Sequence, residues 1–231
     1  MLFRSPETSW TYEVGARTQR SLDLGPITGV EGQISYYHVD FKNRLLTISP
    51  TVVITSIISG AAILQNVGSV KTDGVDIAGT LHFGSHFSIY DALSYNNSRY
   101  EDDYRVGLPA VTVPTAGKKV PGSPDWLNKF VASANYGIFD VQLVGDYLGK
   151  RYATYTNDLS VPAYFTMSAR IAAKIPMPPA SFIHDLVLSL NVTNLTDKKA
   201  ASTLSIGAAS GTFNEFPLAP RQVFGTISFG F

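Results

Sequence analysis

The sequence contains no cysteine, so neither a disulfide framework nor a thiolate metal site is possible. Charged residues are also scarce, at 16% against roughly 25% in an average soluble domain. Lysine plus arginine and aspartate plus glutamate each number 18, so no net positive field attracts nucleic acid. We therefore expect no nucleic-acid partner.

A long hydrophobic run is missing as well. The longest apolar-leaning stretch, residues 51–64, has 14 residues, fewer than the ~18 that a membrane-spanning helix needs. The first residues, MLFRSP, lack the basic region and the following apolar run of an export signal. Any membrane-spanning segments must therefore be strands, and we interpret the chain as a fragment of a longer exported protein.

What the sequence does have is alternation of apolar and polar residues with a period of two, whereas helical periodicity is nearly absent. In the last segment, Val223, Ile227 and Phe231 fall on one face and Gln222 and Thr226 on the other. Such segments occur around residues 10–16, 30–36, 75–83, 87–95, 130–136, 139–147, 165–173, 186–192 and 221–231. The pattern predicts an all-β fold of about nine antiparallel strands.

The connections between these segments alternate in length. The short ones are residues 19–26, 84–85, 137–138 and 176–183, and the longer ones are residues 45–68, 97–126, 151–162 and 194–220. Outer-membrane barrels alternate in this way because their periplasmic turns are short and their extracellular loops are long. A soluble sandwich has no reason to place its long loops on one side. The alternation favours a transmembrane β-barrel whose last strand runs inward and ends at Phe231.

The two faces of the segments fit the same fold. One face is nearly uncharged and has aromatic residues near both strand ends, which is the pattern of two interfacial girdles. The other face is polar, and its basic members include Arg17, Lys129, Arg170 and Lys174. A water-filled or plugged lumen tolerates such charges, whereas the core of a soluble sandwich or lectin domain does not. Asp91 breaks the pattern, because it falls among apolar residues, and the sequence offers no reason for it.

Several segments resemble strands of TonB-dependent outer-membrane receptors. PETSWTYEVG at residues 6–15 is similar to a mid-barrel strand of that family, and QISYYHVDFKN at residues 33–43 resembles the aromatic-rich strand that follows. NVG at residues 66–68 with GVD at residues 74–76 resembles a further strand, with Asp76 in place of the commoner glutamate.

The end of the chain carries two more motifs of the same family. NVTNLTDKK at residues 191–199 closely resembles the penultimate-strand motif, although the tyrosine that usually follows is replaced by Ala200-Ala201. Residues 220–231, which begin PRQV and end in Phe231, resemble the last strand. Each motif alone is weak, but their order and spacing across nearly the whole chain are fairly specific.

The resemblance implies that residues 1–231 are the C-terminal part of a receptor β-barrel in a bacterial outer membrane, with nine of about 22 strands. The plug domain would be absent from this chain and would lie upstream. Arg17, Lys129, Arg170 and Lys174 would then hold the plug or line the transport path, and the barrel-assembly machinery would recognise Phe231. The implied partners are outer-membrane lipid, the protein's own plug, the TonB complex and the assembly machinery.

The longer connections carry aromatic and basic residues that suit capture of an aromatic or anionic ligand. The candidate ligand-binding residues are Tyr100, Tyr104, Arg105, Arg151, Tyr152, Tyr155, Phe213 and Phe216. The alternative is that the tyrosines only order the loops and cap the girdle. A ferric siderophore is the first candidate ligand, and cobalamin, haem and oligosaccharide stay open. Residues 51–64 form either a hairpin that extends the wall or a lid.

No enzyme motif is present. Gly149-Lys150 lacks the spacing and the following Ser or Thr of a phosphate-binding loop, and the four histidines lack metal-ligand spacing. We therefore predict no catalytic residue, no metal site and no cofactor. Two other functions remain open, a plug-free porin or diffusion barrel and, third, a secreted β-rich binding domain.

Overall fold

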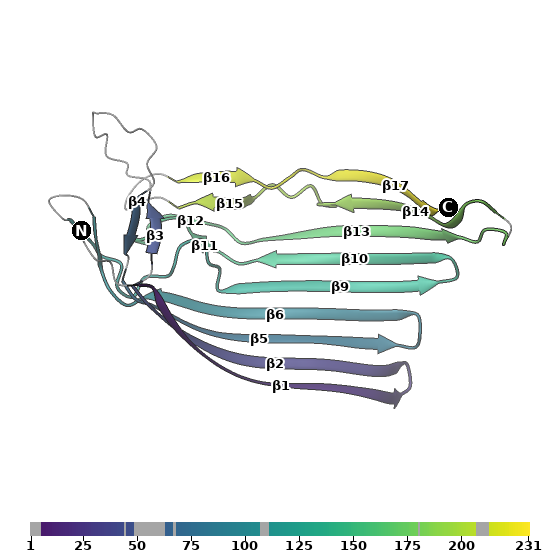
Figure 1. Cartoon of the computed structure of the whole chain (residues 1–231), viewed down its shortest axis with the longest axis horizontal. Helices are drawn as coiled ribbons and strands as arrows, with labels where there is room; N and C mark the ends of the chain where they lie inside the picture. Colours follow the sequence, from purple (N-terminus) through teal and green to yellow (C-terminus); the bar gives the residue numbers. More distant parts are fainter. Residues whose placement is uncertain are drawn as a thin grey trace.

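The computed structural model describes residues 6–43, 45–48, 63–66, 68–106, 111–179, 181–206 and 213–231. Nine long strands form one antiparallel sheet in which each strand pairs with the next long strand of the chain (Figure 1). They are β1 (Thr8–Leu24), β2 (Ile27–Lys42), β5 (Val70–Phe83), β6 (Phe87–Tyr100), β9 (Trp126–Tyr136), β10 (Phe139–Leu148), β13 (Tyr164–Ile175), β14 (His184–Thr193) and β17 (Gln222–Gly230). The described residues include no helix with the length and apolar character needed to cross a membrane. The prediction of an antiparallel all-β fold is confirmed.

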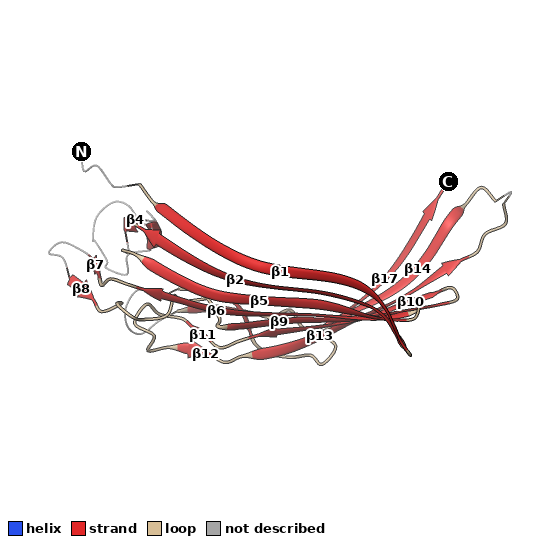
Figure 2. Cartoon of the chain, turned by 90° about the horizontal axis from the view of Figure 1, so that it is seen from below, coloured by secondary structure: helices blue, strands red, loops and turns tan. Residues whose placement is uncertain are grey.

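Four short strand pairs lie in the connections that follow β2, β6, β10 and β14. They are β3 (Leu45–Ile48) with β4 (Ile63–Asn66), β7 (Tyr104–Val106) with β8 (Val111–Val113), β11 (Arg151–Tyr152) with β12 (Ser160–Val161), and β15 (Ala201–Ser205) with β16 (Asn214–Pro217). All four pairs lie at the end of the sheet away from the tight turns: β3–β4, β11–β12 and β15–β16 are toward the left in Figure 1, and β7–β8 is at the left in Figure 2. The predicted alternation of short and long connections is therefore confirmed. Of the apolar stretch 51–64, residues 51–62 lie outside the described residues.

The first turn is shorter than the sequence pattern predicts. The prediction of a connection over residues 19–26 is wrong in its first part, because residues 19–21 continue the ladder by pairing with residues 29–31. The turn itself is Gly25-Pro26, with Gly25 in the left-handed region at φ 62°. Polar residues suggested a turn here, but a barrel strand with one wet face is polar along its whole length.

The register of the sheet joins the apolar residues of single strands into continuous rows. One row crosses eight neighbouring strands and consists of Val30, Leu81, Ile89, Ala132, Leu143, Ala169, Val192 and Val223. Directly opposed residues of neighbouring strands point to the same face. The alternation in single segments therefore becomes one apolar face and one polar face of the whole sheet.

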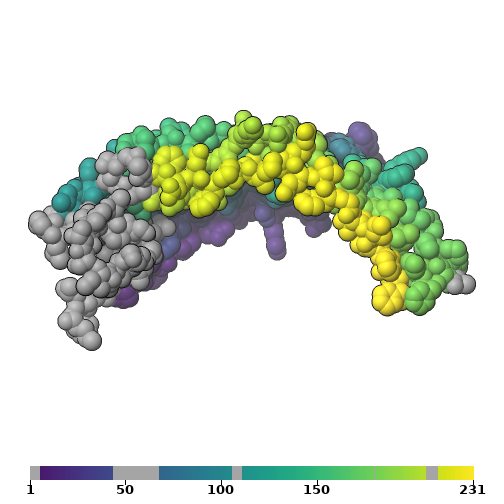
Figure 3. All heavy atoms as spheres, turned by 90° about the horizontal axis from the view of Figure 1, so that it is seen from above, coloured from purple at the N-terminus to yellow at the C-terminus, as the bar shows by residue number. Residues whose placement is uncertain are grey.

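The sheet is strongly curved, and the space-filling view shows an arch that is hollow on one side (Figures 2 and 3). The polar face contains a hollow of about 590 Å³ over β1, β2, β5 and β6. Its polar lining includes Arg17, Gln19, Glu31, Gln33 and Thr80. A hollow lined by polar residues is what the wet interior of a barrel would have.

Candidate functional site: the polar face and the loop body

Two of the four basic residues predicted on the polar face pair with carboxylates across neighbouring strands. Lys129 Nζ of β9 lies 3.0 Å from Asp146 Oδ1 of β10. Lys174 Nζ of β13 lies 3.0 Å from Asp140 Oδ2 of β10. Because the four side chains are partly exposed, each pair contributes only ~0.2–1 kcal/mol to stability. The charges of these two lysines are balanced within the sheet.

The other two basic residues, Arg17 and Arg170, are exposed and form no ion pair within the described part of the chain. Arg17 lines the hollow on the polar face together with Glu31. Glu31 accepts a hydrogen bond from Gln19 Nε2 at 3.1 Å and lies 3.5 Å from His82 Nε2. The two guanidinium groups are therefore available to bind an anionic group on the polar face.

The structure gives a partner to Asp91, the residue that breaks the sequence pattern. Asp91 lies on the apolar face, opposite Gly79 of β5 and Phe130 of β9. Asn128 Nδ2 donates to Asp91 Oδ1 at 2.9 Å and to the carbonyl of Ala92 at 3.0 Å. The amide supplies a hydrogen-bond donor that hydrocarbon lacks, which reduces the cost of a polar group on this face.

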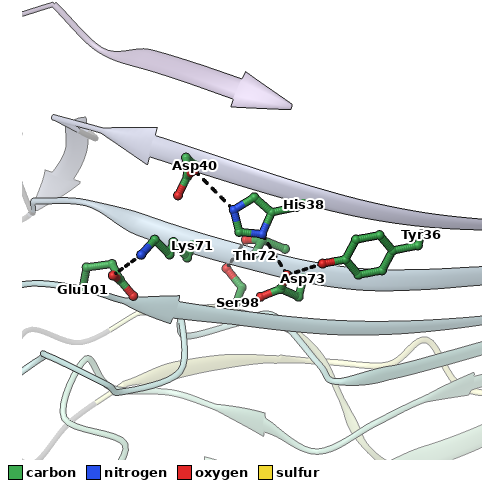
Figure 4. Close-up of polar contacts among 8 residues, drawn as sticks. All are labelled: Tyr36, His38, Asp40, Lys71, Thr72, Asp73, Ser98 and Glu101. Carbon is green, nitrogen blue, oxygen red and sulfur yellow. Dashed lines mark hydrogen bonds and ion pairs between the residues drawn. The ribbon is translucent and has the colours of Figure 1, made fainter. Parts of the chain in front are cut away.

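A polar cluster ties the outer ends of β2 and β5 together (Figure 4). The Tyr36 hydroxyl donates to Asp73 Oδ1 at 2.7 Å, and His38 Nδ1 lies 2.8 Å from the same oxygen. On its other side, His38 Nε2 lies 3.2 Å from Asp40 Oδ2. Both ring nitrogens meet carboxylate oxygens, so a doubly protonated imidazole would donate to both. The alternation within β2 gave no sign of this cluster, because its partners come from two strands.

A second contact in the same view joins the sheet to the connection between β6 and β9. Lys71 Nζ of β5 lies 2.7 Å from Glu101 Oε2 (Figure 4). The next residue, Asp102, accepts a hydrogen bond from the backbone N–H of Ser69 at 3.0 Å. Two acidic side chains from a stretch predicted as a long connection are therefore held by the chain itself.

The β6–β9, β10–β13 and β14–β17 connections contact one another at this end of the sheet, and we name their described residues, together with Val70 and Tyr100 at the adjoining strand ends, the loop body. Its centre is a hydrophobic cluster of Val70, Tyr100, Tyr104, Val113 and Tyr155, against which Phe41, Val120 and Ile206 pack. The ring of Tyr155 lies 5.5 Å from that of Tyr104 and 6.2 Å from that of Tyr100. These distances suit attractive aromatic pairs. The loop body therefore has a core of its own.

Two polar side chains of the β10–β13 connection bond to its neighbours. Asn157 Oδ1 accepts from the N–H of Lys119 at 2.7 Å, and Asn157 Nδ2 donates to the Lys119 carbonyl at 2.9 Å. Arg151 Nη1 donates to the Ser202 carbonyl at 2.9 Å, and Nη2 donates to the Ala201 carbonyl at 2.5 Å. The β10–β13 connection is therefore bonded to the β6–β9 connection on one side and to the β14–β17 connection on the other.

The structure divides the eight predicted ligand-binding residues into two groups. Four are at most 5% exposed within the loop body: Tyr100, Tyr104, Arg151 and Tyr155. Four are exposed or half-buried: Arg105, Tyr152, Phe213 and Phe216. The arrangement of the first group favours the alternative in which these side chains order the loops. Direct contact with a ligand stays a prediction for all eight.

The turn that presents Asn157 is fixed by hydroxyl groups. The hydroxyls of Thr154 and Thr156 donate to Asp158 Oδ1, and these bonds hold the pKa of Asp158 below its usual range. Thr154 Oγ1 also accepts from the N–H of Leu159 at 3.3 Å. Asn157 itself is in the left-handed region, with φ 61°, which asparagine tolerates better than most residues.

The last two sequence motifs bind each other. Asn194 is 6% exposed, and its Nδ2 donates to the carbonyls of Lys198 at 3.0 Å and Ala219 at 2.9 Å. Its Oδ1 accepts from the Lys198 N–H at 2.8 Å. Asp197 Oδ1 accepts from the N–H of Arg221 at 2.9 Å. These bonds join the beginning of the β14–β17 connection to its end.

At the opposite end of the sheet, Phe231 lies beside the tight turns (Figure 1). The residue is 81% exposed. Its ring lies 6.1 Å from that of Phe182 in a stacked arrangement and 6.4 Å from that of Phe229. Recognition of Phe231 by the assembly machinery stays a prediction.

Sequence reasoning singled out Tyr100, Tyr104, Arg151 and Tyr155 only as candidate ligand contacts, and it gave no structural role to Asn157. Asn157 precedes Asp158, and such Asn-Asp pairs are typical of turns that need left-handed backbone. That signal could have indicated a fixed turn. It could not have indicated the bonds to Lys119, because their formation depends on how two separate connections pack.

The sequence profile described as "TonB dependent receptor-like, beta-barrel" matches residues 3–195 of the chain. The ferrioxamine receptor of Yersinia enterocolitica is 26% identical over 166 residues, which are 71% of this chain and 21% of that receptor. The chain therefore spans about a fifth of the length of the curated relative that it matches.

Solved structures of similar shape are also receptors or transporters. The ferric yersiniabactin uptake receptor of Yersinia pestis has a TM-score of 0.68 at 18% identity, covering 97% of this chain and 30% of that one. The ferric citrate transporter FecA has a TM-score of 0.68 at 19% identity, covering 95% and 31%. The copper transporter OprC has a TM-score of 0.69 at 14% identity, covering 99% and 32%. At these identities the likeness shows the fold.

Proposed function

The chain belongs to the TonB-dependent receptor-like β-barrel family, whose members are outer-membrane proteins, and from this premise we propose that it is part of an uptake receptor. In this proposal residues 1–231 form the C-terminal part of the barrel wall. The transported ligand is a ferric siderophore, and transport is energised through TonB. The plug domain is held against the polar face, and the barrel-assembly machinery recognises Phe231.

The edges of the sheet support a role as part of a larger wall. β1 and β17 each pair with a single long strand. Hydrocarbon offers no partner to the N–H and C=O groups of an open edge, and each unpaired group costs several kcal/mol. Strands from outside residues 1–231 would pair with both edges and close the barrel.

The observation that carries the proposal is the curved sheet with one apolar face and one polar, hollow face. The apolar rows suit contact with lipid, and the hollow face suits water or a plug. Arg17 and Arg170 face this side without a carboxylate partner among the described residues. We therefore expect them to bind acidic or carbonyl groups of the plug, or an anionic ligand in transit.

The accessible side chains of the loop body support an organic, anionic ligand. Tyr152 lies under Lys150, whose Nζ is 4.8 Å from the ring centroid. Arg105 and Phe216 are exposed on neighbouring connections. Basic and aromatic groups recognise the charged oxygens and the rings of a chelate. They favour a ferric siderophore over a bare copper ion.

The proposal can be tested by uptake in cells that lack the gene and are complemented with the whole gene. We expect uptake of radioactive iron supplied as one of ferrioxamine, a ferric catecholate or ferric citrate. This uptake should disappear in cells without TonB, because plug movement needs energy from the inner membrane. Uptake that persists without TonB would contradict the proposal and favour a plug-free diffusion barrel.

Two basic residues of the same strand provide a matched test of the polar face. Arg170 and Lys174 both lie on β13, but only Lys174 is paired with a carboxylate within the described residues. Arg170→Ala should lower the uptake rate, and Lys174→Ala should change it less. Normal uptake in both variants would contradict the assignment of this face to the plug or the ligand.

A further inference from the structure

We propose that Arg151 and Asn157 are positioning residues that lock three extracellular connections into one preformed ligand site. This inference rests on the proposed uptake function, and it gives Arg151 a different role from the ligand contact expected from the sequence. In this role neither side chain touches the ligand. Each holds the connections that carry the accessible candidates Arg105, Tyr152 and Phe216.

The geometry of Arg151 suits a residue that holds two connections together better than one that touches a ligand. Its side chain is 5% exposed, and its two terminal nitrogens donate to two consecutive carbonyls, those of Ala201 and Ser202. Its Cζ lies 5.9 Å from the ring centroid of Tyr164. A planar guanidinium can bond two adjacent carbonyls at once, whereas a lysine ammonium is a point charge without this fork. The residue therefore fixes the first strand of the β15–β16 pair against β11.

The geometry of Asn157 is a second, separate lock. Its carboxamide bonds both the N–H and the carbonyl of Lys119, so it mimics one rung of a β-ladder. Close by, the Gly122 N–H donates to the Tyr152 carbonyl at 2.8 Å. Tyr155, two residues before Asn157, belongs to the hydrophobic cluster of the loop body. The β6–β9 and β10–β13 connections are thus held by both polar and apolar contacts.

The two locks meet in one short segment. Arg151 and Asn157 belong to the same connection, which touches a neighbour on each side. The three accessible candidates lie on three different connections, Arg105 in β7, Tyr152 in β11 and Phe216 in β16. Their relative positions therefore depend on these two residues. A preformed arrangement lowers the cost of ordering the loops when a ligand binds, so it raises affinity rather than the transport rate.

The first experiment measures hydrogen–deuterium exchange of the whole-gene product in nanodiscs without ligand. Arg151→Lys should speed exchange in residues 201–205 at least about tenfold, because loss of a charged hydrogen-bonding fork removes at least that factor of protection. Lys150→Met is the matched control, since Lys150 is adjacent and its side chain lies over the Tyr152 ring. The control should leave exchange in residues 201–205 unchanged. Unchanged exchange in Arg151→Lys would overturn the proposal.

The second experiment measures the concentration dependence of uptake. Arg151→Lys and Asn157→Ala should raise several-fold the half-saturating concentration of whichever of ferrioxamine, ferric catecholate or ferric citrate the parent takes up, and should leave the maximal rate per receptor unchanged. A lower maximal rate with an unchanged half-saturating concentration would overturn the proposal.

The chain has no cysteine, so a disulfide between Lys119→Cys and Asn157→Cys can replace the second lock. Oxidation should restore affinity and reduction should remove it, and no difference between the two states would count against the lock.

The proposed function and the proposed role of Arg151 can fail separately. If no siderophore is taken up but Arg151→Lys speeds exchange, the proposed function fails and the lock between connections stands. If uptake is found and Arg151→Lys weakens it with exchange unchanged, Arg151 contacts the ligand directly and the lock fails.

Discussion

The nine-stranded wall and the loop body are parts of one chain, yet they bury their side chains in opposite ways. In the wall, apolar residues such as Leu190, Val223 and Ile227 are 46–68% exposed. In the loop body, Val70 and Tyr100 are at most 1% exposed. Nearly all the described hydrophobic residues that are fully buried belong to the loop body, with Ala172 of the wall as an exception.

The difference shows that the solvent around each region decides which of its side chains are buried. Lipid solvates the apolar face of the wall, so its strands need no packed core and are held by backbone hydrogen bonds between neighbours. Water surrounds the loop body, so its connections can be ordered only by removing apolar surface from water. Four experiments test this difference between the wall and the loop body.

The largest effect is expected from removal of a core residue of the loop body. Tyr155→Ala should destabilise the packed connections by about 3–5 kcal/mol, as for other buried aromatic residues. The measurement is protease cleavage of the β6–β9 and β10–β13 connections in the folded protein. Tyr12→Ala is the control, because Tyr12 is 61% exposed on the wall. Equal protease resistance of Tyr155→Ala and the parent would show that the loop body does not depend on its core.

A charge on the apolar face should have the next largest effect. Leu190→Arg should destabilise the barrel by about 2–4 kcal/mol, because a lipid-facing arginine must leave water. Ser189→Arg, one residue away on the polar face, should be tolerated. The measurement is urea unfolding of the whole-gene product in lipid vesicles. If both variants behaved alike, the assignment of the two faces would be wrong.

Asn194 tests the junction between the two regions. Asn194→Ala removes the partner of two carbonyls and one N–H, and it should cost about 1–3 kcal/mol because buried polar groups lose their hydrogen bonds. Exchange protection of residues 195–199 and 218–221 should fall together. Asn194→Gly keeps the left-handed backbone at φ 48° but not the amide, so it separates the two contributions. Full protection in both variants would contradict the role of the side chain.

The smallest effect concerns pH. The hydroxyls of Thr154 and Thr156 hold the pKa of Asp158 below its usual range, so the ionised form is favoured in the folded turn. The resulting stability is present above the ordinary pKa of about 4 and is lost as pH falls through the lower, folded pKa. Protease resistance of the β10–β13 connection should decline in that acidic range. Asp158→Asn should remove this component, and an unchanged pH profile in the variant would contradict it.

The sequence pattern was most informative for the wall. Alternation within segments such as residues 221–231 predicted strands and faces correctly, because each strand has a solvent that differs on its two sides. The pattern failed at residues 19–21, where a polar strand looked like a turn, and it gave no partner for Asp91. Asn128, which binds Asp91, lies 37 residues away, and its position depends on sheet register.

The loop body was the least predictable region. Tyr100, Tyr104 and Tyr155 were recognised as notable residues, but their burial depends on how three connections pack. The same holds for Arg151, because its guanidinium donates to carbonyls of a segment about 50 residues away.

By itself, the sequence determined the strand-rich fold, the alternation of short and long connections, and the division into an apolar and a polar face. These features are local, because a period of two and a turn are encoded by neighbouring residues. Only the tertiary structure decided which charges are paired, which loop residues are buried and which side chains remain accessible. Those properties depend on contacts between residues far apart in the chain, and such contacts exist only once the sheet has set its register.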